Sequence, residues 1–287
     1  MKISTEIASI AKIVGEEKAI EYVAKAGFDH WDFSMFEMAR FNKATGKLFE
    51  TGHPLMGNER LAFARKLKQI GLDFGITCNQ AHAPFPVRIP EILDAQKYAL
   101  ECAAEAGAKI CVVHPDNFKS PEENAEMYFE LLPFAKEYGV KIATENMWNW
   151  DTEKLEALPA ACSDAKNFLD HILAVNDPYF VACLDIGHAE MRGLNTTAVE
   201  CIHTLGDHLQ ALHIHDNDKW HDSHMLPFSM DIDFDAILKA LKDIGYNGDF
   251  TLEADRHIGN RPAEEVFSGV CEMAKSTRKL ADMFEAL

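Results

Sequence analysis

Long hydrophobic runs and a surplus of basic residues are missing from this sequence of 287 residues. No apolar run approaches the ~18 residues that a membrane-spanning helix needs. The first 18 residues are interrupted by Glu6 and lack a small-residue cleavage pattern. Lysine and arginine number 28 against 46 aspartates and glutamates, and the resulting net charge of −18 repels phosphate backbones and anionic lipids. We therefore expect a mature cytoplasmic protein that binds neither nucleic acid nor membranes.

Several catalytic and cofactor-binding motifs are absent as well. No GxGxxG or GxxxxGK[ST] loop follows an apolar run, and neither HExxH nor GxSxG occurs. The seven cysteines form no CxxC pair and lie among apolar neighbours, so we expect them to be reduced and mostly buried. Hydrophobic residues make up 47% of the chain and charged residues 26%, which is typical of a folded globular protein.

Short apolar runs alternate with longer amphipathic stretches along the whole chain, a pattern that predicts repeated βα units around a parallel sheet. Eight such units can be counted. The expected strands cover residues 2–5, 30–35, 72–78, 109–114, 140–145, 179–185, 209–215 and 249–255. The expected helices begin near Glu16, Asn58, Pro90, Pro121, Ser163, Thr196, Asp233 and Pro262, several of which are prolines or cap residues.

Eight even βα units without a break in composition have the size and rhythm of an α/β protein with a single (β/α)8 TIM barrel spanning residues 1–287. A doubly wound open sheet is the alternative, but it lacks the expected glycine-rich loop. Two connections, Arg40 to Asn58 and Asp216 to Asp231, are longer than usual βα loops. They follow the second and seventh strands, so we expect them over the mouth where barrel enzymes keep their active sites.

Acidic and imidazole side chains fall at the carboxyl ends of the last four expected strands. Period-two alternation places them with Ala143, Cys183 and His213 on the inward face of the barrel. Three acids and an imidazole could converge there only if a cation neutralised them. Hard oxygens with one nitrogen suit Mn²⁺, Co²⁺ or Mg²⁺, and Zn²⁺ also fits. The predicted metal ligands are Glu145, Asp185, His215 and Glu253.

Further polar and aromatic residues are expected at the same mouth. His82 follows the third strand, His114 ends the fourth, and His188 lies three residues beyond Asp185. Their placement favours contacts with a substrate, while ligation of further metal ions together with Asp222 or His224 is the alternative. Trp148, after the fifth strand, could form a wall of the pocket or simply pack the loop.

The motifs at these strand ends resemble the xylose isomerase-like TIM barrel superfamily of sugar isomerases and epimerases, which also includes endonuclease IV. The resemblance covers essentially the whole chain. It rests on the ordered set AHAPFP, VVHPDN, ATEN, LDIGH, HIHDND, WHDSHMLPFSMDIDF and LKDIGYNGDFTLEAD. The family's usual PGEG turn is replaced here by Pro227 to Met230, so the resemblance does not define the lid over the site.

The resemblance implies a divalent-metal-dependent sugar isomerase or epimerase. In the family's ketose epimerases one ion is held by residues that match Glu145, Asp185, His215 and Glu253, and the two glutamates also transfer the proton next to the carbonyl. The histidine matching His188 is expected to hold substrate oxygens. The cation that closes the family's sugar site has two candidates in this chain, Arg256 and Lys219.

Three other functions stay open. Endonuclease IV resemblance implies a phosphodiesterase with a second ion on His82 and His114 and a third on His188, Asp222 and His224, although the net charge disfavours a DNA substrate. A cyclitol (inosose-type) dehydratase would use the same ion and base, and a non-catalytic sugar-binding protein would use only the ion. The sequence identifies neither the sugar, nor its phosphorylation, nor whether the chain forms a homo-oligomer.

Overall fold

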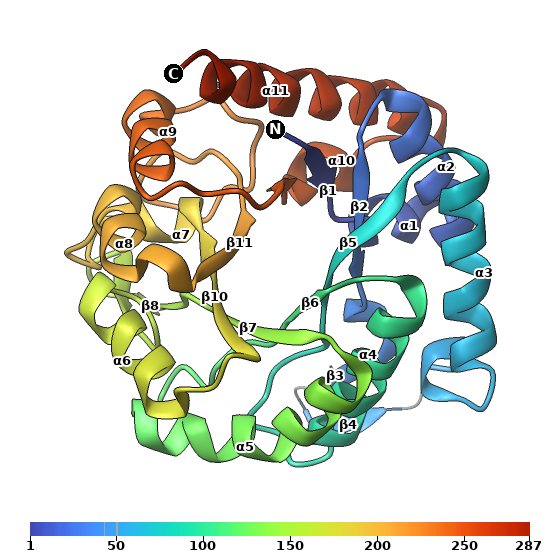
Figure 1. The fold of residues 1–287 in the computed structure, drawn as a ribbon, viewed down its shortest axis with the longest axis horizontal. Coiled ribbons are helices and arrows are strands. Elements are labelled where there is room, and N and C mark those ends of the chain that lie inside the picture. Colours follow the sequence, from blue (N-terminus) through green and yellow to red (C-terminus); the bar gives the residue numbers. More distant parts are fainter. Residues whose placement is uncertain (43, 50) are drawn as a thin grey trace.

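The computed structural model describes residues 1–42, 44–49 and 51–287 and shows a closed ring of eight parallel strands. Six strands are hydrogen-bonded in the order β11-β10-β7-β6-β5-β2, and β1 pairs with β12. The bridges Glu6–Asp32 and Ile214–Leu252 join the two sets and close the ring (Figure 1). The strands are β1 Ile3–Thr5, β2 His30–Ser34, β5 Thr77–His82, β6 Ile110–Val112, β7 Lys141–Glu145, β10 Phe180–Asp185, β11 Leu209–His213 and β12 Phe250–Leu252.

Helices surround the ring and follow each strand, so the predicted (β/α)8 TIM barrel is confirmed (Figure 1). Their starts agree closely with the expected ones; the largest difference is in the last helix, which begins at Val266 rather than Pro262. The helices are α1 Ala8–Val14, α2 Glu16–Ala26, α3 Arg60–Asp73, α4 Ile92–Ala106, α5 Pro121–Tyr138, α6 Ala165–Val175, α7 Ile186–Ala189, α8 Ala198–Leu205, α9 Phe234–Asp243, α10 Asp255–Gly259 and α11 Val266–Ala286.

Local chemistry explains several of these boundaries. Helix α5 begins with a capping box, in which the Glu123 amide donates to the Ser120 hydroxyl and the Ser120 amide donates to the Glu123 carboxylate. Helices α6 and α8 have a simple N-cap, in which the side-chain oxygens of Asp164 and Thr197 accept the backbone amides of Asn167 and Glu200. Short 3₁₀ turns complete the connections at Phe36–Met38, Pro54–Met56, Gly206–His208 and Ala263–Glu265.

The structure differs from the expected elements in several places. The strand expected at residues 72–78 starts only at Thr77, because Leu72 and Asp73 form the last turn of α3, and Gly75, at a φ of 83°, follows it. Two antiparallel hairpins were not predicted. They are β3 Arg40–Asn42 with β4 Lys47–Phe49, and β8 Trp148–Asp151 with β9 Glu156–Pro159.

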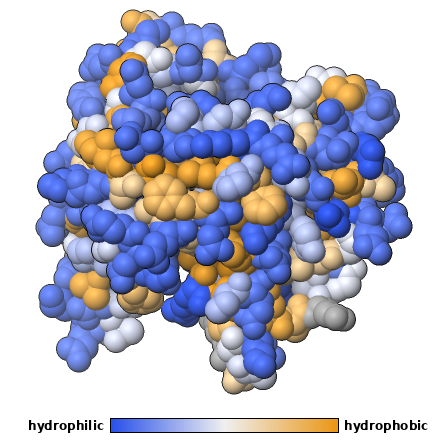
Figure 2. Space-filling model, turned by 60° about the horizontal axis from the view of Figure 1, so that its bottom comes forward, coloured by the Kyte–Doolittle hydropathy of each residue, from blue (hydrophilic) through white to orange (hydrophobic). Residues whose placement is uncertain are grey.

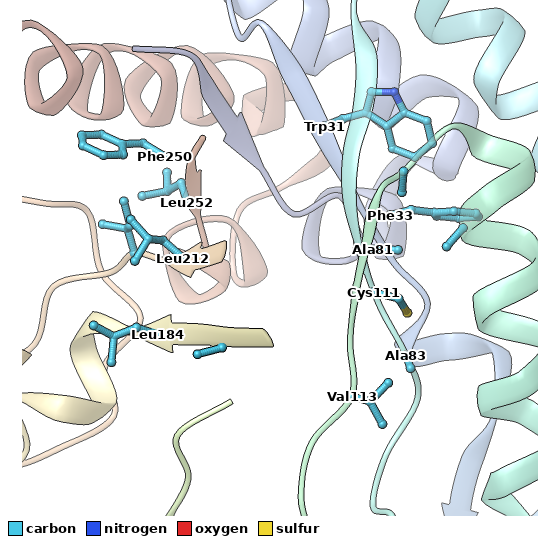
Figure 3. Packing of buried hydrophobic residues seen from close by; sticks show 14 of the residues in the cluster. Trp31, Phe33, Ala81, Ala83, Cys111, Val113, Leu184, Leu212, Phe250 and Leu252 are labelled. Carbon is cyan, nitrogen blue, oxygen red and sulfur yellow. The ribbon is translucent and has the colours of Figure 1, made fainter. Parts of the chain in front are cut away.

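The apolar residues form two main layers, as the alternation predicts. Ala143, Val181, Cys183 and Ala211 pack with Val112 inside the ring. The intervening strand residues point outward to the helices, and Figure 3 shows ten of them around the ring. The polar residues that share the inward face therefore project into the buried interior of the ring. The outward residues labelled there are Trp31, Phe33, Ala81, Ala83, Cys111, Val113, Leu184, Leu212, Phe250 and Leu252.

The exterior is mainly polar. Hydrophilic side chains predominate on the face drawn in Figure 2, with smaller hydrophobic areas between them. All seven cysteines are free, and six are buried, as expected. Within the described ranges no helix combines the length and apolar character that crossing a membrane requires.

Candidate metal centre

Adjacent strands bring four ligand-type side chains to one level near the top of the barrel. Cys183 pairs with Glu145 across β10 and β7, and Asp185 pairs with His213 across β10 and β11. Glu253 follows β12 directly. Because the carboxyl ends of parallel strands share one rim of the barrel, all four residues meet there.

We call Glu145, Asp185, His213 and Glu253 the central group. One ligand atom from each lies within 4.8 Å of all the others. The His213 Nδ1 atom is 3.0 Å from Glu145 Oε1 and 3.4 Å from Glu253 Oε2. Glu145, Asp185 and His213 are buried, and the Glu253 side chain is 12% exposed. Three carboxylates and one imidazole at this depth form a donor set for a divalent cation.

The central group differs from the predicted ligand set in its histidine, because His213 stands where His215 was expected. Both residues lie on the inward face, but His215 is two residues further along, beyond the last residue of β11. Two extended residues advance the chain by about 6.6 Å along the strand direction, which is tilted to the barrel axis. His215 consequently sits above the central group, although its Nε2 still lies 3.1 Å from Asp185 Oδ1.

A second group consists of His82, His114 and Glu145. The two Nε2 atoms of the histidines are 2.9 Å apart, and they lie 3.4 Å and 3.1 Å from Glu145 Oε2. Glu145 therefore belongs to both groups, one through each of its carboxylate oxygens. Its position allows it to bridge two cations or to serve one.

A third group, which we call the loop group, consists of His188, His215, Asp222 and His224. Asp222 and His224 belong to the long connection between β11 and α9, whereas His188 lies in α7 and His215 just after β11. The sequence-predicted residues His82, His114, His188, Asp222 and His224 are thus all brought to the same mouth.

Burial and mutual proximity shift the pKa values of these groups in opposite directions. Burial alone would raise the pKa of Glu145, but the neighbouring His213, His114 and His82 lower it well below its usual value. Burial raises the pKa of Glu253 to about 8. Burial also lowers the pKa of His114 to about 4. The two glutamates of the central group therefore have very different proton affinities.

Unsatisfied polar atoms support a cation at this mouth. Asp185 Oδ2, His215 Nε2 and Asp222 Oδ1 are buried, and no hydrogen-bond partner for them lies in the described part of the chain. Buried polar atoms are normally paired, and an unpaired acceptor in such a place is costly. Each of these three atoms can act as a metal ligand, so the residues present fit the metal that the donor set implies.

A pocket of about 340 Å³ opens above the groups. Trp148 lines it, in agreement with one of its two predicted roles. The two cationic side chains expected to close the sugar site do not line this pocket. The Lys219 ammonium lies 3.3 Å from Glu190, and Arg256 is exposed on α10. The lining residues are Phe36, His82, Phe85, His114, Glu145, Met147, Trp148, His188, Asp222, His224, Glu253 and Asp255.

Sequence reasoning missed Asp32 of β2 as well as His213. Asp32 is fully buried, and its Oδ2 lies 3.8 Å from His213 Nε2, on the ring edge opposite the central group. The alternation of β2 contained a signal, since Trp31 and Phe33 are strongly apolar and leave Asp32 facing inward. Phe36, Phe85 and Met147, by contrast, lie outside the barrel strands, Phe36 in a short 3₁₀ turn and the other two in loops, where no strand periodicity could predict their direction.

Comparison with known proteins establishes the family. The sequence profile of the family described as Xylose isomerase-like TIM barrel matches residues 20–282. The chain therefore belongs to this family of TIM barrels. Among solved structures, a D-tagatose 3-epimerase-like protein superposes with a TM-score of 0.73 at 20% identity, covering 100% of this chain and 99% of that one. IolI with a binding zinc atom gives 0.72 at 18% identity, with 100% of both chains covered.

Curated proteins are similar to this chain over part or most of its length. An uncharacterized protein of Methanocaldococcus jannaschii is 29% identical over 60% of this chain, and one of Sinorhizobium fredii is 31% identical over 56%. The chain spans only 62% and 53% of their respective lengths. The L-ribulose-5-phosphate 3-epimerase UlaE of Shigella flexneri is 25% identical over 79% of this chain and 80% of its own length. Proteins named as sugar 3-epimerases are thus among those similar to this chain in sequence or fold.

Proposed function

We propose that this protein is a divalent-metal-dependent epimerase or isomerase of an unphosphorylated ketose, with Glu145 and Glu253 as its proton-transfer pair. The observation that carries the proposal is the central group. Two glutamates approach His213 Nδ1 from different strands, at 3.0 and 3.4 Å, at the floor of a pocket of about 340 Å³. A pocket of this size is ample for a monosaccharide.

The chemistry requires removal of a proton from a carbon next to a carbonyl. A divalent cation held by Glu145, Asp185, His213 and Glu253 would supply a Lewis acid for the negative charge that develops. One glutamate accepts the proton on one face of the carbon, and the other returns a proton on the opposite face or at the neighbouring carbon. Phe36, Phe85 and Trp148 line the pocket and exclude water from the reacting carbon.

The charge of the pocket favours a neutral sugar. Among its described lining residues there is no lysine or arginine, while Glu145, Asp222, Glu253 and Asp255 are acidic. A phosphate group is usually bound by arginine, lysine or a helix N-terminus. Solved structures of a D-psicose 3-epimerase with D-fructose and a D-allulose 3-epimerase with D-allulose have this fold, and those ligands are also unphosphorylated.

Hydrolysis of a phosphodiester is the second candidate, and the observation that favours it is the presence of the two further ligand groups beside the central one. Multinuclear sites can activate water and stabilise both oxygens of an in-line displacement. The net charge of −18 and the acidic pocket disfavour a nucleic-acid substrate. A small phosphodiester would be the substrate to test.

Solvent-isotope incorporation separates these functions. Purified protein supplied with Mn²⁺ is incubated in D₂O with a panel of ketohexoses and ketopentoses, and the sugars are then analysed by mass spectrometry and chromatography. An epimerase yields a new sugar that carries deuterium, whereas a cyclitol dehydratase, tested with an inosose, yields a product lacking one water. Turnover of bis(p-nitrophenyl) phosphate without sugar turnover would transfer the assignment to hydrolysis. Sugar binding without turnover or exchange would show a non-catalytic protein.

A further inference from the structure

A second pocket, of about 250 Å³, adjoins the one that opens above the ligand groups. We call it the side pocket. Phe85, His114 and Met147 line both pockets, so the two are neighbours at the mouth of the barrel. Together their volumes fall within the roughly 300–1,000 Å³ of typical small-molecule sites. The mouth therefore offers more room than a single ketose requires.

Phe85 stands at the boundary between the two pockets. Its ring is stacked on the His114 imidazole, with centroids 4.8 Å apart and an interplanar angle of 24°, and it meets the Phe36 ring edge-on at 5.4 Å. Phe85 is nevertheless 42% exposed, so part of it stays open to a ligand. A ligand longer than one sugar ring can therefore extend past Phe85 from one pocket into the other.

The side pocket contains hydrogen-bonding groups that local contacts hold in place. The Phe118 amide donates to Asp116 Oδ1 at 3.1 Å, and Asn117 Nδ2 donates to the Trp148 carbonyl oxygen at 3.0 Å. Within the described ranges Asp116 Oδ2 and Asn117 Oδ1 accept no hydrogen bond, and the exposed Arg88 guanidinium donates none. All three side chains line the pocket, which thus offers a charged donor and two free acceptors.

Phe118 adds an apolar surface to the same pocket. It is 71% exposed, more than any other large hydrophobic residue in the described part of the chain. Sugar rings combine apolar C–H faces with hydroxyl groups at their edges. An aromatic ring beside polar groups suits such a ligand, because aromatic side chains bury much apolar area through their faces.

We propose that the side pocket is a subsite for a glycosyl unit, so that the substrate is a ketose joined to a pyranose rather than a free monosaccharide. This inference rests on the proposed function. Each sugar hydroxyl both donates and accepts, which matches Arg88 together with Asp116 and Asn117. The opposite charges of Arg88 and Asp116 favour a neutral ligand, since the carboxylate repels a phosphate. A wholly apolar substituent would take these polar groups out of water without giving them partners.

Deuterium incorporation from D₂O into the sugar tests the substrate class. D-Fructose is compared with three disaccharides in which a pyranose is linked to it, maltulose, lactulose and isomaltulose. We expect kcat/KM for at least one disaccharide to exceed that for D-fructose by ~10-fold or more, because the hydrogen bonds of the second ring include charged partners. Turnover of D-fructose with equal or lower kcat/KM for all three disaccharides would overturn the subsite and leave the proposed function standing.

Two variants connect this preference to the side pocket. Arg88→Ala should lower the ratio of kcat/KM for the disaccharide to kcat/KM for D-fructose by ~10-fold or more, and Phe118→Ala should lower it by ~3-fold or more. Lys119→Ala is the matched control, because Lys119 is exposed in the same connection, carries the same charge and lines neither pocket. Equal ratios in Arg88→Ala and Lys119→Ala would overturn the assignment. So would a preference for D-fructose 6-phosphate that Arg88→Ala removes, since that result indicates a phosphate subsite.

Calorimetric titration separates failure of the subsite from failure of the proposed function. If no sugar incorporates deuterium, the proposed function fails, and the same Mn²⁺-loaded protein is titrated with D-fructose and with each disaccharide. Binding of one disaccharide that is tighter by ~10-fold or more, weakened in Arg88→Ala and kept in Lys119→Ala, would support the subsite. Equal affinities for D-fructose and the disaccharides, or no binding of either, would overturn it.

Discussion

At the scale of single residues, Glu145 and Glu253 differ in how many ligand groups they serve. We predict that Glu145→Gln and Glu253→Gln each lower kcat by ~10²-fold or more, because an amide cannot accept or return the proton. Glu145→Gln should also reduce binding at two groups, and Glu253→Gln at one. Turnover is measured together with metal content. Undiminished turnover in a metal-loaded variant would exclude that residue from proton transfer.

Asp32 should act on the metal through His213. The Asp32 carboxylate lies 3.8 Å from His213 Nε2, where its negative charge favours a proton on that nitrogen and makes the ligating Nδ1 more basic. Losing a carboxylate beside a ligating histidine typically costs 10–100-fold in metal affinity. We therefore expect Asp32→Asn to weaken Mn²⁺ binding by ~10-fold or more, measured by competition with a chelating dye. Ser34→Ala is the matched control, because it removes the hydroxyl that donates to Asp32 Oδ1 but keeps the carboxylate. Equal effects of both changes would argue against the contact with His213.

Glu6 should make stability depend on pH. Burial raises its pKa from 4.5 to about 7, so the folded protein binds this proton more tightly than the unfolded chain does. The stabilisation is complete below pH 4.5 and is lost as the pH rises to about 7. Glu6→Gln mimics the protonated form. Between pH 5 and pH 8 the wild-type protein should lose roughly 2–3 kcal/mol more of its unfolding free energy than the variant in urea titrations. Parallel pH curves would contradict this assignment.

His213 and Asp32 are the two site residues that the sequence did not predict, and the physical reason differs between them. Alternation along β11, the seventh strand of the barrel, placed both His213 and His215 inward. It contains no information about how far along the barrel axis each side chain lies. Height depends on where β11 ends and on its register against Asp185, which are properties of the closed ring. Asp32 was missed for a different reason: it lies in the middle of an expected strand, whereas only strand ends were searched for ligands.

At the scale of elements, the β8–β9 hairpin is positioned by a close approach of backbone. Gly193 has a φ of 98°, and a Cβ atom there would lie 2.0 Å from the carbonyl oxygen of Ala157 in β9. We expect Gly193→Ala to destabilise the fold by about 2–4 kcal/mol, since it adds a backbone clash to an unfavourable φ.

Gly139→Ala is the control for this prediction. Gly139 ends α5 with a φ of 68°, and a Cβ atom there would meet nothing within 4 Å. The control therefore reports the backbone cost alone, about 1–2 kcal/mol. Both unfolding free energies are measured by urea titration, and equal losses would show that the hairpin can move away from Gly193. Neither hairpin could be predicted from the sequence, because both are short, lie within long βα connections and lack a strong two-residue turn signal.

At the scale of the whole molecule, the eight units were predictable because the same signals recur along the chain: an apolar strand, an amphipathic helix and, in most units, a cap residue or proline at the helix start and a glycine after the helix end. Closure of the eight strands into a ring was harder to predict from the sequence than the units themselves. It depends on β1 pairing with β12, which lie at opposite ends of the chain, and on two isolated bridges. The regular number of units favoured a closed barrel, but the pairing itself is non-local.

This closure predicts that residues 1–287 unfold as a single cooperative domain. Residues from both ends of the chain contribute to the main apolar layer, from Ile3 on β1 to Phe284 on α11, so neither half can keep its core when the other unfolds. We expect urea transitions followed by far-ultraviolet circular dichroism and by tryptophan fluorescence to coincide. The tryptophans sample separate regions, with Trp31 on β2, Trp148 and Trp150 on β8, and Trp220 in the 216–231 connection. An earlier fluorescence transition would show that the chain contains a separately unfolding part.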